Sequence, residues 1–220
     1  MKKNTLKFWR LIIPGIIIIL LAIPAFTKTA EELKNLSLIF QTINWQDSII
    51  LGIMIIIGAI YYSINGRWIV WKHFNKKVQD NIKERILTSC SLKFTYEKWN
   101  KLKEGRSLMT IFYHFVDTDR SLTDKAEDVR HNGLIWSTCF DITILTGIAG
   151  YTYLIIAVLS VKDYLIYVSA ISFALSFIFL GFSSLLTYKH LKLSNEQLDV
   201  ISQKYKNEVD EKIQEVIDAL

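Results

Sequence analysis

The chain has 220 residues, a formal net charge of +5 and two cysteines. Its mean hydropathy of +0.26 is too high for an ordinary soluble domain, whereas its charged fraction of 21% is too high for a protein made only of membrane spans. The composition therefore predicts a protein that lies partly in a membrane and partly in water. Two cysteines exclude a disulfide-stabilised extracellular module, and an apolar content of 51% excludes a disordered chain.

Four apolar segments predict transmembrane helices and an all-α fold, because a bilayer core of about 30 Å needs roughly 20 apolar residues in a helix. The predicted spans are residues 11–27, 48–71, 134–160 and 164–188. The first is the shortest, and the cations that precede it also fit a signal peptide. Asn65 and Gly66 are expected to kink the second span at the membrane surface.

The cations beside the spans predict which parts face the cytoplasm. The tail 1–10 carries cations and no acid, and the segment 72–133 opens with a strong excess of cations, so both are predicted to be cytoplasmic. The loop 28–47 and the hairpin 161–163 lack such an excess and are predicted to be extracytoplasmic. Four spans then return the C-terminal segment to the cytoplasm.

The segment 72–133 is predicted to be a small helical cytoplasmic part. Apolar residues spaced by three or four positions predict an amphipathic helix that continues the second span; they are Trp71, Phe74, Val78, Ile82 and Ile86. Thr95–Glu104 is typical of a short helix that ends at Gly105. Ser107–Val116 fits either a buried helix or a strand.

Residues 189–220 are predicted to form a C-terminal amphipathic helix. Ser194 and Gln197 have the spacing of a capping box, which predicts that a helix starts there. Apolar residues then recur about every 3.7 positions and form one face. Such a face needs a partner, which is either the basic segment of the same chain or the equivalent helix of neighbouring subunits.

Asp141 is the residue that most strongly indicates a functional site, because an ionisable group within a span is costly unless it is paired, hydrated or protonated. In an oligomer it could form an acidic ring along a cation pathway. Alternatively, it pairs with Arg67, which lies at a comparable depth on the second span.

Hydroxyl residues within the spans have two interpretations. They could line a water-filled path together with Asp141, or they could let helices approach closely. The residues concerned are Ser137, Thr152, Ser172 and Ser176.

The basic cytoplasmic segment is a candidate binding site for an anionic partner such as a nucleotide, an oligonucleotide or a lipid headgroup, since its cations alternate with aromatic residues. The plainer interpretation is the topology signal itself together with attraction to anionic lipids. The cations are Lys72, Lys76, Lys77, Lys83, Arg85, Lys98, Lys101, Lys103 and Arg106.

No motif for catalysis, metal binding or a cofactor occurs in the sequence, and the four histidines lack ligand spacing. Asp117–Ser121 begins like a calcium loop, but Leu122 replaces the required glycine, so a turn and helix cap is the better interpretation. An enzyme is therefore not expected.

The layout of a span running into a basic helix, a late hairpin at Lys162–Asp163 and a helical tail resembles the small membrane subunits of bacterial anti-phage operons. These include the membrane partner of the Kiwa system, the Hailong membrane effector and the membrane effectors of cyclic-oligonucleotide signalling. The resemblance implies a homo-oligomer, commonly a tetramer, in the bacterial inner membrane, but it carries no residue role onto this chain. The expected function is a membrane pore or membrane-disrupting effector that is gated from the cytoplasm. The alternatives are a sensor or scaffold that holds and releases a soluble partner, and a small-solute transporter.

Overall fold

The computed structural model describes residues 3–27, 29, 31–32, 34–35 and 48–219, and within this part of the chain it contains helices and no strand. The predicted all-α class is thus confirmed there, while most of the predicted loop 28–47 lies outside the described residues. The chain divides into two compact units. The apolar unit holds the chain up to Trp71 with Leu134–Leu185, and the polar unit holds Lys72–Gly133 with Leu186–Leu220.

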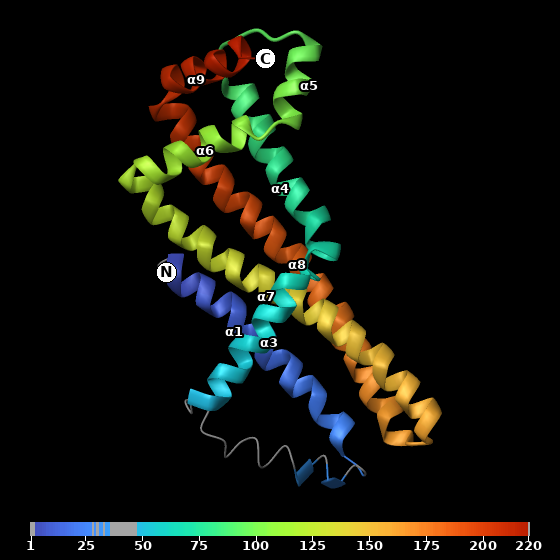
Figure 1. The fold of residues 1–220 in the computed structure, drawn as a ribbon. Coiled ribbons are helices and arrows are strands. Elements are labelled where there is room, and N and C mark those ends of the chain that lie inside the picture. Colours follow the sequence, from blue (N-terminus) through green and yellow to red (C-terminus); the bar gives the residue numbers. More distant parts are fainter. Residues whose placement is uncertain (1–2, 28, 30, 33, 36–47, 220) are drawn as a thin grey trace. The chain divides into compact units, whose positions relative to one another are not determined.

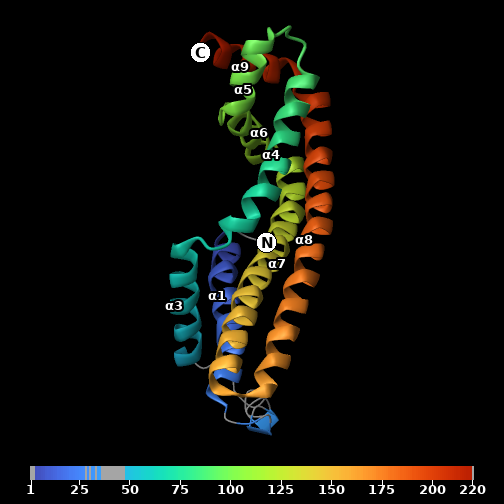
Figure 2. The same ribbon diagram turned by 90° about the vertical axis from the view of Figure 1, so that its right-hand side faces the viewer.

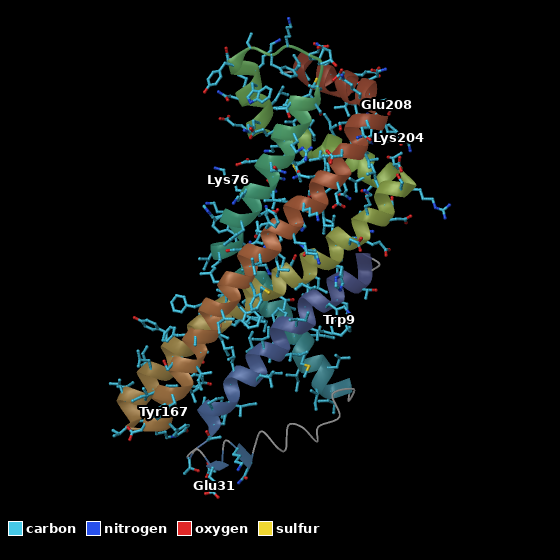
Figure 3. All side chains as sticks on the ribbon, turned by 180° about the vertical axis from the view of Figure 1, so that it is seen from behind. Trp9, Glu31, Lys76, Tyr167, Lys204 and Glu208 are labelled. Carbon is cyan, nitrogen blue, oxygen red and sulfur yellow. The ribbon has the colours of Figure 1, made fainter. Side chains whose placement is uncertain are left out.

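The apolar unit has the composition of a membrane-embedded part. Its helices are α1 (Lys3–Ala22), the short 3-10 helix η1 (Ile23–Phe26), α3 (Ser48–Ile64) and parts of α7 (Arg120–Ser160) and α8 (Asp163–Lys204). Among the described residues, three helices are long and apolar enough to cross a membrane, and a fourth span is present if α3 and α4 (Trp68–Ser89) form one broken span. Its outer surface is apolar and aromatic, as Tyr167 on α8 illustrates (Figure 3). Such a surface suits lipid rather than water.

Helices α1 and α3 cross with their backbones in close contact (Figure 1). A Cβ atom added to Gly58 would lie 1.7 Å from the carbonyl oxygen of Leu11, and one added to Gly15 would lie 2.1 Å from that of Met54. Along α1 from Leu11 to Gly15, the contacted residue of α3 moves back from Gly58 to Met54, so the two helices are antiparallel. Glycine makes this approach possible because it has no side chain.

Within the apolar unit, α7 and α8 run side by side as an antiparallel pair (Figure 2). Hydroxyl groups join them: Ser169 Oγ donates to the carbonyl oxygen of Gly150, and Ser176 Oγ to that of Thr143, each at 2.7 Å. The small-residue faces on these two helices thus serve helix packing.

The predicted second span, 48–71, is broken in the structure. Helix α3 ends at Ile64, α4 begins at Trp68, and Asn65 between them has a φ of 54°. Asparagine tolerates this left-handed conformation better than most residues, because its short side chain can bond locally. The expected kink at Asn65 is therefore a full interruption of the helix.

The predicted helix start at Ser194 is wrong. Helix α8 continues without interruption from Asp163 to Lys204, so Ser194 lies in its interior, where it and Gln197 are buried. No glycine or proline precedes Ser194 closely enough to end the helix, and a capping box needs a terminus to act on. Helix α7 contains the predicted span 134–160 and begins earlier, at Arg120.

The polar unit is a packed set of helices that includes the tail. It contains most of α4, α5 (Tyr96–Glu104), α6 (Ser107–Thr118), the polar ends of α7 and α8, and α9 (Lys206–Asp218). Helix α5 confirms the predicted short helix, with Thr95 and Gly105 as its caps. The helical alternative for Ser107–Val116 is the one observed. The predicted apolar faces are buried, as shown by Val78, Ile82, Ile86, Leu198, Ile201, Val209 and Ile213.

Candidate functional site

Asp141, on α7, is only 1% exposed and is held by three hydrogen bonds. Arg67 Nε donates to Oδ1 at 2.9 Å, and Arg67 Nη2 donates to Oδ2 at 2.7 Å. The hydroxyl of Tyr61, in the last turn of α3, also donates to Oδ1, at 3.0 Å. This bidentate contact is the strongest geometry available to an arginine and a carboxylate.

The helix break places Arg67 beside Asp141. Arg67 is the last residue of the break between α3 and α4, and its guanidinium carbon lies 5.9 Å from the centre of the Tyr62 ring. A carboxylate that is buried alone costs several kcal/mol, on the order of the penalty for any unpaired charge in a protein interior. Arg67 offsets that cost. The structure thus shows the Arg67 pairing that the sequence left open as one of two interpretations.

A second guanidinium lies near this pair. Arg10, on α1, is close enough to interact electrostatically with both Arg67 and Asp141. Its Nε atom is shielded from solvent and has no hydrogen-bond partner in the described part of the chain. We call Arg10, Tyr61, Arg67 and Asp141 the charge cluster. With two guanidiniums and one carboxylate it carries a net positive charge.

The four predicted hydroxyl residues all donate to backbone carbonyl groups. Ser137, Thr152 and Ser172 bond to carbonyl oxygens of their own helices, whereas Ser176 bonds across to α7. Thr152 is exposed, and Ser137 and Ser172 are buried. The structure therefore does not gather these hydroxyls around Asp141.

The predicted basic residues differ in their exposure and in their partners, and Lys101 is both exposed and paired. Lys83 is buried and donates to the carbonyl oxygen of Lys103 at 2.7 Å. Three others form ion pairs: Arg85 with Asp199, Lys101 with Glu97, and Lys103 with Glu84. The exposed cations are Lys72, Lys76, Lys77, Lys98, Lys101 and Arg106, and Figure 3 shows Lys76 projecting from α4.

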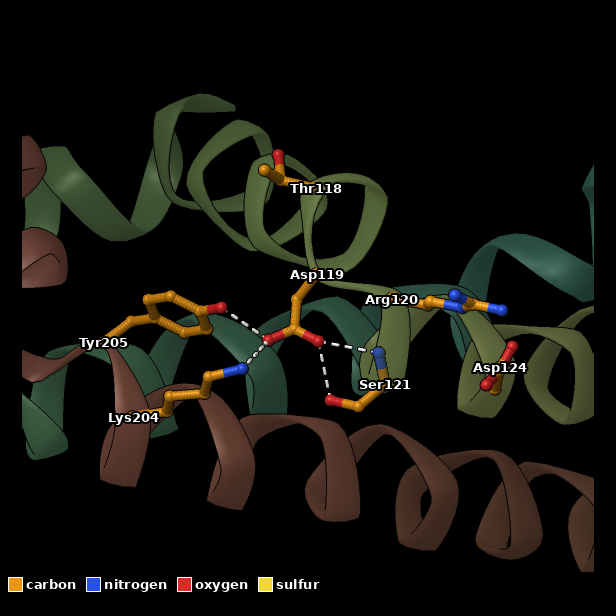
Figure 4. A pocket seen from close by; sticks show the side chains of 7 residues that line it. All are labelled: Thr118, Asp119, Arg120, Ser121, Asp124, Lys204 and Tyr205. Carbon is orange, nitrogen blue, oxygen red and sulfur yellow. Dashed lines mark hydrogen bonds and ion pairs between the residues drawn. The ribbon is translucent and has the colours of Figure 1, made fainter.

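Asp119 joins several helix ends in the polar unit (Figure 4). Its Oδ1 accepts hydrogen bonds from the backbone N–H and the hydroxyl of Ser121 and thereby caps the start of α7. Its Oδ2 accepts from Lys204 Nζ at 2.5 Å and from the hydroxyl of Tyr205, at the junction of α8 and α9. These bonds lower the pKa of Asp119 well below its ordinary value, with Lys204 the largest cause. The predicted turn and helix cap is confirmed.

The depression beside Asp119 has a volume of about 580 Å³ and is lined by Thr118, Asp119, Arg120, Ser121, Asp124, Lys204 and Tyr205. Asp119 and Lys204 form an ion pair with one another, and the Tyr205 ring stacks on Phe115 at 5.1 Å between centroids. These two contacts therefore hold the start of α9 against the rest of the polar unit. Within the described residues, no group of three or more His, Cys, Asp or Glu side chains is placed to hold a metal ion.

Sequence reasoning missed Tyr61 and Arg10 as parts of the cluster. Each flanks an apolar run, which is the usual place for a membrane-anchoring tyrosine or arginine, so neither stood out. Tyr61 reaches Asp141 through packing of α3 near α7, and Arg10 lies on α1, which crosses α3 at Gly15 and Gly58; no local pattern reveals either arrangement. Comparisons with protein-family models, curated proteins and solved structures find no match.

Proposed function

We propose that the chain is a homo-oligomeric membrane effector, pore-forming or membrane-disrupting, that is gated from the cytoplasm. One observation carries this proposal: the arginine that neutralises Asp141 lies in the break from which α4 leads into the polar unit. A signal that changes α4 therefore acts directly on the charge state of the membrane-embedded part. The proposed layout has four spans, with the broken α3–α4 segment as the second, and both terminal segments cytoplasmic.

Withdrawal of Arg67 is the proposed gating event. Asp141 would then be a buried carboxylate without a counter-ion, which is stable only if water or cations reach it. In a ring of four subunits, the four Asp141 carboxylates would favour cations over anions. We propose a tetramer in the bacterial inner membrane, acting in anti-phage defence as the resemblance of the layout implies.

Cation flux from liposomes that contain the purified protein tests the proposal. Arg67→Gln should raise potassium efflux above that of the unsubstituted chain, because it frees Asp141. The double variant Arg67→Gln/Asp141→Asn should lose the preference for potassium over chloride. Absence of flux from every variant, in an oligomer shown to be intact by its mass in detergent, would contradict the pore.

A second candidate is supported by the exposed cations of α4 and α5. Lys76, Lys98 and Arg106 are exposed, and no ion pair is assigned to them in the described part of the chain. They suit a soluble anionic partner, such as an oligonucleotide or an acidic protein. Lys76→Glu and Lys98→Glu should abolish binding of a short oligonucleotide if the chain works as a scaffold. Lys103→Glu breaks an ion pair within the polar unit and is the comparison for a loss of stability.

A further inference from the structure

Arg10 has hydrogen-bonding capacity that the protein does not use. A guanidinium has five N–H donors, and burying one of them without an acceptor is energetically costly. The Nε atom of Arg10 is in this position, since it is shielded from solvent and has no partner in the described part of the chain. The cost implies that an acceptor from outside the chain completes the site.

Arg67 offers donors at the same place. Asp141 uses Nε and one N–H of Nη2, and no bond from Nη1 is found among the described residues, so both Nη1 donors remain for a ligand. The two arginines repel one another, and the single carboxylate of Asp141 cannot balance both. An added anion between the guanidiniums would remove this imbalance.

The position of these arginines indicates where the anion comes from. Arg10 immediately precedes the apolar run of α1, and Arg67 follows the apolar run of α3. Because α1 and α3 are antiparallel, both residues lie at the same end of the helix pair, where apolar residues give way to polar ones. In a bilayer this is the level of the lipid phosphates.

We propose that Arg10 and Arg67 bind a phosphate group, supplied by the headgroup of an anionic membrane lipid. The planar donors of two arginines match the oxygen atoms of a phosphate, and such contacts are strong where water is scarce. The bound phosphate would complete the charge cluster and hold the α1–α3 pair against the start of α4. This inference does not depend on ion conduction.

Lipid retention measured by native mass spectrometry tests the proposal. The full chain is equilibrated with mixed micelles containing phosphatidylglycerol or phosphatidylcholine, and separately with inorganic phosphate alone. The chain should retain phosphatidylglycerol at least tenfold more than phosphatidylcholine. Arg10→Gln should abolish this preference, whereas Lys7→Gln, which removes an exposed cation one turn earlier on α1, should change it less than twofold.

The outcomes separate the two sources of phosphate. Displacement of the lipid by millimolar inorganic phosphate would retain the site but assign it to a soluble phosphate. Equal retention of both lipids with no phosphate binding would overturn the proposal. If Arg10→Gln fails to fold, Arg10→Lys keeps the charge without the planar donors and should lower the preference severalfold, and the lipid comparison on the unsubstituted chain still decides the question.

Discussion

Asp119 and Lys204, which are 85 residues apart in the sequence, form an ion pair of 2.5 Å that links the start of α7 to the end of α8. Asp119→Asn should release α9 selectively, since an asparagine oxygen can still cap α7 but cannot form the ion pair. Amide exchange in residues 206–218 should become faster, while exchange in α5 should not change. Asp124→Asn, at the same depression but exposed, is the matched control. Unchanged exchange in α9 would show that its apolar face alone holds it.

The same carboxylate predicts a pH dependence. Lys204, Ser121 and Tyr205 lower the pKa of Asp119, so its stabilising effect is complete above the ordinary carboxyl pKa of about 4 and is lost as the pH falls below that value. Protection of α9, corrected for intrinsic exchange rates, should therefore be the same at pH 6 and pH 8 and decline below about pH 4. A decline between pH 8 and pH 6 would point to another group.

Asp141→Asn should destabilise the apolar unit by about 3–5 kcal/mol, because it leaves Arg67 without a counter-ion in a site where its side chain is 13% exposed. Adding Arg67→Gln should recover part of the loss, since the double variant no longer contains the Arg67 guanidinium without its counter-ion. Asp128→Asn, exposed on the same helix, should change stability by less than about 0.5 kcal/mol. Unfolding by denaturing detergent, followed by circular dichroism, measures all three.

Gly58→Ala should disrupt the α1–α3 crossing. The new Cβ atom would meet the backbone of Leu11, which cannot move as a flexible side chain can, so the cost should reach about 3 kcal/mol, the upper part of the range for overpacking. Gly52→Ala on the same helix meets nothing within 4 Å and should stabilise α3 by up to about 1 kcal/mol. Equal thermal stability of the two variants would contradict the crossing.

The thiol of Cys90 should react slowly with alkylating reagents. Burial, together with a hydrogen bond to Asp210 on α9, raises its pKa to about 11. At neutral pH its thiolate fraction is then roughly two orders of magnitude below that of a free cysteine. In a Cys139→Ser background, maleimide labelling should be slow, and Asp210→Ala should accelerate it. Rapid labelling of the unsubstituted site would show that α9 does not cover this turn.

Apolar runs and helical spacing were sufficient to predict the long apolar helices, the buried stripe of α4 and the short helix α5, because each follows from local composition. The run-on of α8 was not predicted, since the lack of a helix stop between Tyr188 and Ser194 is a weaker signal than a capping box. The charge cluster was predicted only as far as Arg67 and Asp141. Its other members come together through packing between distant segments.

The ion pair between Asp119 and Lys204 can form only late in the synthesis of the chain. At about 5–20 residues per second, a ribosome adds Lys204 some 4–17 s after Asp119, given the 85 residues between them. The glycine crossing of α1 and α3 involves only residues that are made earlier. The apolar helices α1 and α3 can therefore begin to pair before the ion pair of the polar unit can form, so a newly made chain passes through a period in which α4 is present and α9 is not.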